Sequence, residues 1–309
     1  MKLREGTLPA HLAVISANII FGATFSVVKL ITPSLIAPLS LNVVRIVISV
    51  ALFWSLLLFN PSKPGIQRSD LLRFLICAVT GVAINQIFYI KGISLTTPIH
   101  GALLMLGTPI MITFIAAWLL KEKLTPTKLT GLLLGITGAA VLVLQRTGSS
   151  ESKNMLLGDL LIILNAASYA FYLVLVKPLM ERYSPVEVIR WVCTFGAFII
   201  VPVGWNDFTQ TNWQAFTPQA WAALAFVVVG ATFLAYLFNI YGVHRLGASV
   251  TGAYIYSQPL FAAAISMIFT GETLTGAKVL SAVLIFAGVY LSTFQQTSGS
   301  SDSQKTKNG

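Results

Sequence analysis

The sequence is poor in charged residues, and above all in acidic ones. Of its 309 residues only 10% are charged, as 20 Lys and Arg against 10 Asp and Glu. An ordinary soluble domain carries about 25% charged residues, so this chain has too few charges to cover the surface of a soluble protein. A hydrophobic content of 56% also excludes intrinsic disorder for the chain as a whole. The class that remains is an integral membrane protein with many spans.

Cysteine and histidine are also scarce, with two and three residues respectively. Cys77 and Cys193 both fall inside apolar runs, which predicts buried thiols and gives no support for a disulfide. The histidines are far apart, and no metalloprotease, nucleophile-elbow or P-loop string occurs. The sequence therefore predicts a protein that is not an enzyme and has neither a cofactor nor a metal site.

Long apolar runs, by contrast, occupy most of the chain. A helix needs about 20 mostly apolar residues to cross a bilayer, and ten runs come close to that length. They do not alternate between apolar and polar residues as the strands of a membrane barrel do. The predicted fold is therefore all-α, with ten transmembrane helices at Ala10–Leu30, Leu39–Phe59, Leu71–Ile90, Ile99–Leu120, Leu129–Leu144, Leu156–Val176, Val186–Trp205, Ala220–Tyr241, Ala248–Thr270 and Ala277–Phe294.

The distribution of positive charge predicts the orientation. If the N-terminus lies in the cytoplasm, most Lys and Arg residues fall on cytoplasmic connections, as the positive-inside rule requires. We therefore expect a multi-pass protein of the cell (inner) membrane with both termini in the cytoplasm. This explains the net charge of +10 without a nucleic-acid partner. The polar tail, residues 295–309, is expected to be disordered and cytoplasmic.

The chain contains an internal repeat. The segment Gly92–Thr125 matches Gly242–Thr275 at a constant offset, which places Pro109 on Pro259, Glu122 on Glu272 and Leu124 on Leu274. The first two helices of each half also match, so we expect one five-helix repeat at residues 1–147 and a second at residues 154–294. Because five is odd, the second repeat enters the membrane from the opposite face. Inverted repeats of this kind recur in secondary transporters, whose substrate sites lie near the midplane between the halves.

Uncharged polar and aromatic residues within the spans are the candidates for a substrate cavity. They concentrate in spans 1, 3, 4, 6, 8 and 9, and such groups turn away from lipid, which cannot satisfy them. Hydrogen bonds between helices and an interfacial aromatic belt are the alternative explanations. The candidates are Asn18, Asn85, Gln86, Tyr89, His100, Asn165, Tyr169, Tyr172, Tyr236, Asn239, Tyr254, Tyr256 and Gln258.

Four charged residues at related positions of the two repeats are candidates for structural or gating roles. Arg45 lies about 10 Å into the second span at 1.5 Å per residue, where it needs either a partner, a wet cavity or a path for its stem to the interface. Arg190 is its counterpart in the second repeat. Glu122 and Glu272 close the fourth and ninth spans. They are interpreted either as interfacial caps or ion pairs with Lys123 or Lys278, or as gating or packing contacts repeated by symmetry.

Spans 5 and 10 are almost purely apolar and rich in small residues. Gly131-x-x-x-Gly135 in span 5 is a signature of close helix packing. These helices are therefore expected to serve either as a scaffold or as the contact surface of a homodimer.

These motifs carry a resemblance to a known family. Two five-helix repeats, each ending in P-x12-E-x-L-T and a Gly-containing apolar helix, resemble the EamA-type branch of the drug/metabolite transporter superfamily. An Arg in the second helix of each repeat, here Arg45 and Arg190, is similar, and so is the run from Phe21-Gly22 to Lys29. The resemblance implies a ten-helix inner-membrane carrier with cytoplasmic termini and a central cavity lined by helices 1, 3, 4, 6, 8 and 9.

The leading functional hypothesis is a secondary transporter that works by alternating access and exports amino acids or related small metabolites. Its partners are then a small-molecule substrate and the lipid bilayer. The sequence leaves open whether transport is coupled to protons or is facilitated diffusion. Alternative hypotheses are a carrier of sugars, nucleotide derivatives or drugs, a channel, and a lipid-modifying membrane enzyme.

Overall fold

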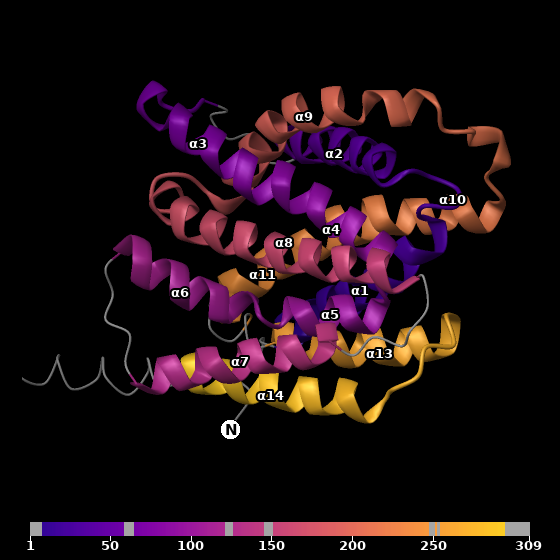
Figure 1. Cartoon of the computed structure of the whole chain (residues 1–309). Coiled ribbons are helices and arrows are strands. Elements are labelled where there is room, and N and C mark those ends of the chain that lie inside the picture. Colours follow the sequence, from indigo (N-terminus) through magenta and orange to yellow (C-terminus); the bar gives the residue numbers. More distant parts are fainter. Residues whose placement is uncertain are drawn as a thin grey trace, which may run out of the picture.

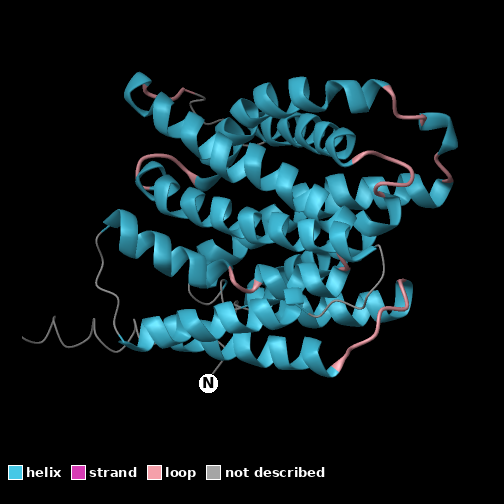
Figure 2. Ribbon diagram, in the orientation of Figure 1, coloured by secondary structure: helices cyan, strands magenta, loops and turns pink. Residues whose placement is uncertain are grey.

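The protein is described by a computed structural model that covers residues 8–58, 65–120, 126–144, 151–246, 251 and 254–293. All regular elements in these segments are helices (Figure 2). The first half comprises α1 (Leu8–Ile31), α2 (Pro38–Ser55), η1 (Leu56–Leu58), η2 (Arg68–Asp70), α3 (Leu71–Ala78), η3 (Val79–Ile84), α4 (Asn85–Leu95), α5 (Pro98–Met105), α6 (Thr108–Leu120) and α7 (Pro126–Leu144). The second comprises α8 (Glu151–Met180), α9 (Pro185–Thr209), η4 (Trp213–Ala215), α10 (Pro218–Ala225), η5 (Phe226–Leu234), α11 (Ala235–Leu246), η6 (Tyr254–Ser257), α13 (Gln258–Phe269) and α14 (Gly276–Thr293).

The predicted ten-span architecture is confirmed. Six helical stretches of the described chain have the length and apolar composition to cross a membrane, and four shorter apolar helices accompany them. Large apolar side chains cover the outside of the bundle; Phe198 is 74% exposed and Ile268 76%. Such a surface is stable against lipid and would aggregate in water.

The two repeats pack so that equivalent helices meet. Helix α2 packs on its counterpart α9, and α7 packs on its counterpart α14. Cross pairs follow the same symmetry, since α4 packs on α8 and α1 packs on α11. This is the arrangement that two inverted five-helix repeats predict.

The ends of the bundle are set by the connections between helices (Figure 1). The α9–α10 and α13–α14 connections lie at one end, which we call the Glu272 end. The α8–α9 connection lies at the other, which we call the Arg182 end. Several helices begin with a hydroxyl cap followed by proline, as at Thr97-Pro98, Ser184-Pro185 and Thr217-Pro218. The cap accepts a free backbone N–H, and proline occupies a position whose N–H has no helical partner.

The glycines of spans 5 and 10 pack against one another within this chain. A Cβ atom added at Gly288 of α14 would lie 2.5 Å from the carbonyl oxygen of Gly131 and 2.6 Å from the amide nitrogen of Gly135 on α7. The backbones of α7 and α14 are therefore in contact. The Gly131-x-x-x-Gly135 motif permits this contact, which agrees with the predicted scaffold role of these helices. The homodimer contact stays a prediction.

Candidate functional site

A cavity of about 810 Å³ lies between the two repeats. Its lining comes from α2, η3 and α4 of the first repeat and from α8, α9, η5 and α11 of the second. It extends from Asn42, near the start of α2, to Met180 and Pro185 at the Arg182 end. Ligand cavities have volumes of about 300–1,000 Å³. The space is therefore sufficient for a small metabolite and is shared by both halves.

Spans 2, 3, 6, 7 and 8 supply the described lining residues. This differs from the set of helices implied by the family resemblance. Spans 2 and 7 contribute, whereas spans 1, 4 and 9 contribute no described lining residue. The reason is the direct packing of α2 against α9, which brings both helices to the central space.

A π-helical segment borders the cavity in each repeat. Gly81 and Val82 of η3 and Thr232 of η5 line it. At the repeat offset, η3 falls on residues 229–234 of η5, so both π segments occupy equivalent positions. Segments of π-helix interrupt the regular hydrogen-bond ladder and recur at functional sites. Because both repeats have a π-helical segment at this position, the cavity border is a repeated feature of the fold.

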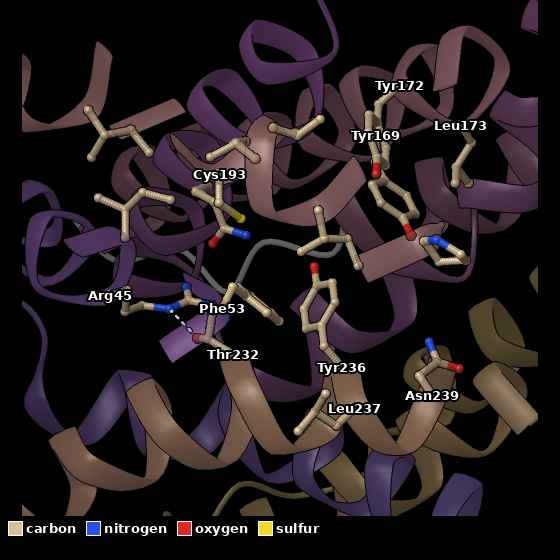
Figure 3. A pocket seen from close by; sticks show the side chains of 18 of the residues that line it. Arg45, Phe53, Tyr169, Tyr172, Leu173, Cys193, Thr232, Tyr236, Leu237 and Asn239 are labelled. Atoms are coloured by element: carbon tan, nitrogen blue, oxygen red, sulfur yellow. Dashed lines mark hydrogen bonds between the residues drawn. The ribbon is translucent and has the colours of Figure 1, made fainter. Parts of the chain in front are cut away.

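Arg45 reaches the cavity from α2. Its side chain does not extend to the surface, because the residue is only 7% exposed. Its Nε donates a hydrogen bond to Thr232 Oγ1 at 3.2 Å (Figure 3). That hydroxyl donates in turn to the Val227 carbonyl at 2.9 Å. An arginine near the bilayer centre costs about 2.5–3.5 kcal/mol on insertion scales. The structure resolves the sequence alternatives in favour of a buried arginine beside a cavity.

Six of the residues singled out from the sequence share this cavity. Besides Arg45 they are Gln86, Tyr169, Tyr172, Tyr236 and Asn239. Tyr169 and Tyr172 have ring centroids 5.7 Å apart. Figure 3 shows Tyr236 and Tyr169 turned toward the same space. Their hydroxyls form no hydrogen bond to any described residue.

The other polar candidates lie outside the lining, and most bind one another between helices. Asn85 and Asn165 exchange side-chain hydrogen bonds with each other's backbone carbonyl, at 3.4 and 2.7 Å. Gln258 donates to Asn18 Oδ1 at 2.9 Å. Interhelical hydrogen bonding, the alternative weighed above, describes these four residues.

The remaining aromatic and basic candidates have separate surroundings. Tyr89 packs edge-on against Phe25 with ring centroids 5.7 Å apart. Tyr254 lies at 2.7 Å from His11 Nδ1. Arg190 is buried with its guanidinium 5.5 Å from the centroid of the Trp54 ring. The side chain of Tyr256 and the whole of Glu122 lie outside the described residues.

Two adjacent hydroxyls join the repeats at the Glu272 end. Thr96 Oγ1 donates a short hydrogen bond to Asp159 Oδ1, and Thr97 Oγ1 donates to Glu272 Oε1 at 2.6 Å. His100, a sequence candidate, lies at 3.3 Å from the second oxygen of Asp159. We call Thr96, Thr97, Asp159 and Glu272 the interrepeat contact. None of the four lines the cavity.

Glu272 is held by donors from both repeats. Lys278 Nζ lies 2.9 Å from Oε1, which is the ion pair that the sequence suggested, and Ser266 donates to Oε2 at 2.8 Å. Burial alone would raise the pKa of Glu272. The hydrogen bonds from Thr97, Lys278 and Ser266 outweigh it and hold the pKa of this carboxyl below its ordinary value.

Sequence reasoning missed Asp159, Thr232 and Asn42. Asp159 is 1% exposed and lies within the run predicted as the sixth span. A carboxylate inside an apolar run is itself a signal, and it would have identified this residue. Thr232 and Asn42 carried no such signal, because hydroxyls and amides are common in membrane helices.

Two inverted helical repeats that share a cavity are an arrangement that recurs in membrane transporters. Comparison with known proteins agrees. The chain belongs to the EamA-like transporter family, whose model matches residues 8–144 and again residues 156–294.

Similar proteins come from bacteria, archaea and plants. The uncharacterized transporter YetK of Bacillus subtilis is 23% identical over 93% of this chain and 87% of its own length. An uncharacterized transporter of Archaeoglobus fulgidus is 25% identical over 93% of this chain and 98% of its own. The Arabidopsis thaliana protein WALLS ARE THIN 1 is 25% identical over 83% of this chain and 74% of its own. A solved crystal structure with 19% identity matches with a TM-score of 0.61 over 93% of this chain and 96% of that one, which supports the fold.

Proposed function

We propose that this protein is a secondary transporter that exports amino acids or related small metabolites by alternating access, and that it is not an enzyme. The observation that carries the proposal is the cavity between the repeats. It reaches the Arg182 end and stops short of the interrepeat contact at the Glu272 end. A space that reaches residues at one end of the bundle and not the interrepeat contact at the other is what one state of an alternating-access carrier requires.

The positive-inside rule assigns the two ends. Arg68, Arg73 and Arg182 lie at the Arg182 end, which we therefore place on the cytoplasmic side of the inner membrane, together with both termini. The cavity is then accessible from the cytoplasm, as the loading state of an exporter requires. Breakage of the interrepeat contact would open the opposite side.

The test is transport by the purified full chain in liposomes. A broad panel of labelled amino acids and metabolites is offered with and without a pH gradient, and lipid turnover is assayed in parallel. We expect saturable uptake that is accelerated when unlabelled compound is present on the opposite side, which a carrier shows and a channel does not.

Matched variants tie the flux to the cavity. Thr232→Trp fills the cavity, whereas Thr130→Trp adds the same bulk at an exposed position on α7. We expect flux to be lost in the first and kept in the second. Absence of flux for every panel compound, or covalent turnover of a lipid, would contradict the proposal.

A further inference from the structure

We infer that the cavity recognises its substrate by a carboxylate group bound at Arg45 and by an apolar body packed along the remaining wall. This inference rests on the proposed function and adds the chemical class of the substrate to it.

Arg45 is the only charged side chain among the described residues that line the cavity. Arg190 also leaves its Nη1 buried without a partner in the described chain, but it does not line the cavity. Arg182 forms an ion pair with Asp70 at 3.0 Å, and Lys278 forms one with Glu272. No described carboxylate forms such a pair with Arg45. The cavity therefore carries one positive charge that no described carboxylate balances.

The guanidinium also has unused hydrogen-bonding capacity. Nε donates to Thr232, but Nη1 is buried without a partner in the described chain. A guanidinium presents its donors in a planar fork that matches a carboxylate, and the charge-assisted pair is among the strongest hydrogen bonds in proteins. A substrate carboxylate supplies both the missing charge and the missing acceptor.

The walls of the cavity define the rest of the molecule. Phe53, Leu173, Ile189, Val192 and Ile200 contribute apolar side chains. These residues favour an aliphatic or aromatic body. The free hydroxyls of Tyr169 and Tyr236 stand among them and can accept or donate one further hydrogen bond.

A substrate ammonium, by contrast, finds no counter-charge among the described lining residues. Asn42 and Gln86 each leave a carboxamide oxygen without a partner, and these can accept an N–H. A neutral amide oxygen does not replace a carboxylate as partner of a cation, so an amino group on the substrate contributes less than its carboxylate. The carboxylate is therefore required and the amine is dispensable.

The test uses four probes with one phenyl body and different head groups: 3-phenylpropionate, phenylalanine, phenethylamine and 3-phenylpropanamide. Their binding to the detergent-purified full chain is measured by the ligand-dependent shift of the thermal unfolding midpoint and by competition. We expect both carboxylates to bind at least tenfold more tightly than the amine and the amide. Because this series needs no variant, it decides the inference even if substitutions at Arg45 fail to fold.

Variants of Arg45 then test whether this side chain causes the preference for carboxylates. Arg45→Gln should abolish the tenfold preference, Arg45→Lys should retain part of it, and Arg190→Gln should leave it intact, because Arg190 does not line the cavity. Equal binding of the amine or amide, or an unchanged preference in Arg45→Gln, overturns the inference.

The two proposals fail separately. If none of the four probes binds while some panel compound is transported, the inference is overturned and the proposed function stands. If the carboxylates bind with the expected preference but no compound crosses the membrane, the carboxylate site stands and the proposed function fails.

Discussion

Thr97 and Glu272 are 175 residues apart in the chain, yet the Thr97 hydroxyl donates a hydrogen bond of 2.6 Å to the Glu272 carboxylate. The bond joins the start of α5 in the first repeat to the α13–α14 connection in the second. The other oxygen of Glu272 accepts the backbone N–H of Ile99 at 3.2 Å. A carboxylate of one repeat thus accepts hydrogen bonds from the helix start of the other, which joins the two repeats at the Glu272 end of the bundle.

Replacing Thr97 by Val removes this hydroxyl while preserving the shape of the side chain. Hydrogen bonds to charged groups contribute about 1.5–3 kcal/mol, so we expect the free energy of unfolding to fall by about that amount. Thermal unfolding of the purified protein measures it. The control is Thr130→Val, since the exposed Thr130 hydroxyl bonds only to its own helix. Equal stability of the two variants would show that Thr97 does not hold the repeats together.

The Glu272 carboxyl should make stability depend on pH. Its pKa is lowered in the folded protein, so its contribution is complete above the ordinary value of 4.5 and is lost as the pH falls below that value. Unfolding midpoints measured from neutral pH down to acid should therefore decline more steeply for the wild-type chain than for Glu272→Gln. Parallel curves for the two proteins would contradict the assignment of this carboxylate to the contact.

Altering Asp159 should cost more stability than removing the exposed Arg182 from its ion pair with Asp70. Asp159 is 1% exposed and binds Thr96 and His100, so Asp159→Asn disturbs a buried network. Breaking a buried pair costs about 3–5 kcal/mol. Arg182→Ala removes the largely exposed partner of Asp70, for which we expect about 1 kcal/mol or less. Expression level and thermal unfolding compare the two variants, and a larger loss in Arg182→Ala would refute this ranking.

Close packing of α7 on α14 predicts an effect of one added methyl group. In Gly288→Ala the new Cβ meets the backbone of Gly131 and Gly135, whereas at Gly276 nothing lies within 4 Å of an added Cβ. Overpacking typically costs about 1–3 kcal/mol, so Gly288→Ala should unfold at a lower temperature than Gly276→Ala. If the two unfold together, the helices do not meet as described.

Much of the fold can be predicted from the sequence, because the patterns that indicate helices and repeats can be read directly along the chain. Apolar runs of membrane length give the spans, and the matches of Pro109 with Pro259 and of Glu122 with Glu272 give the repeat. The helix starts at these prolines also follow a local rule: Pro109 and Pro259 lie in the first turn of α6 and α13, where the missing N–H of proline costs no helical hydrogen bond.

The sequence predicts which residues line the cavity less well than it predicts the fold. Asn18 and Gln86 are both span-embedded amides, but Asn18 binds Gln258 whereas Gln86 lines the cavity. Whether a polar residue bonds to another helix or lines the cavity depends on the rotation of its own helix and on partners from the other repeat. The π segments η3 and η5, which shift that rotation, carry no sequence motif of their own. The pairing of Thr96 with Asp159 likewise depends on tertiary packing.

The most direct measurement of the central claim uses the native thiols. Cys193 lines the cavity and Cys77 is buried away from it, so Cys77→Ala leaves one reporter thiol in the cavity. A membrane-impermeant thiol reagent is applied to vesicles of each orientation, with and without a compound that the protein transports. The account predicts labelling from the cytoplasmic face, slowed by that compound. Labelling that the transported compound does not slow, or no labelling from either face, would contradict it.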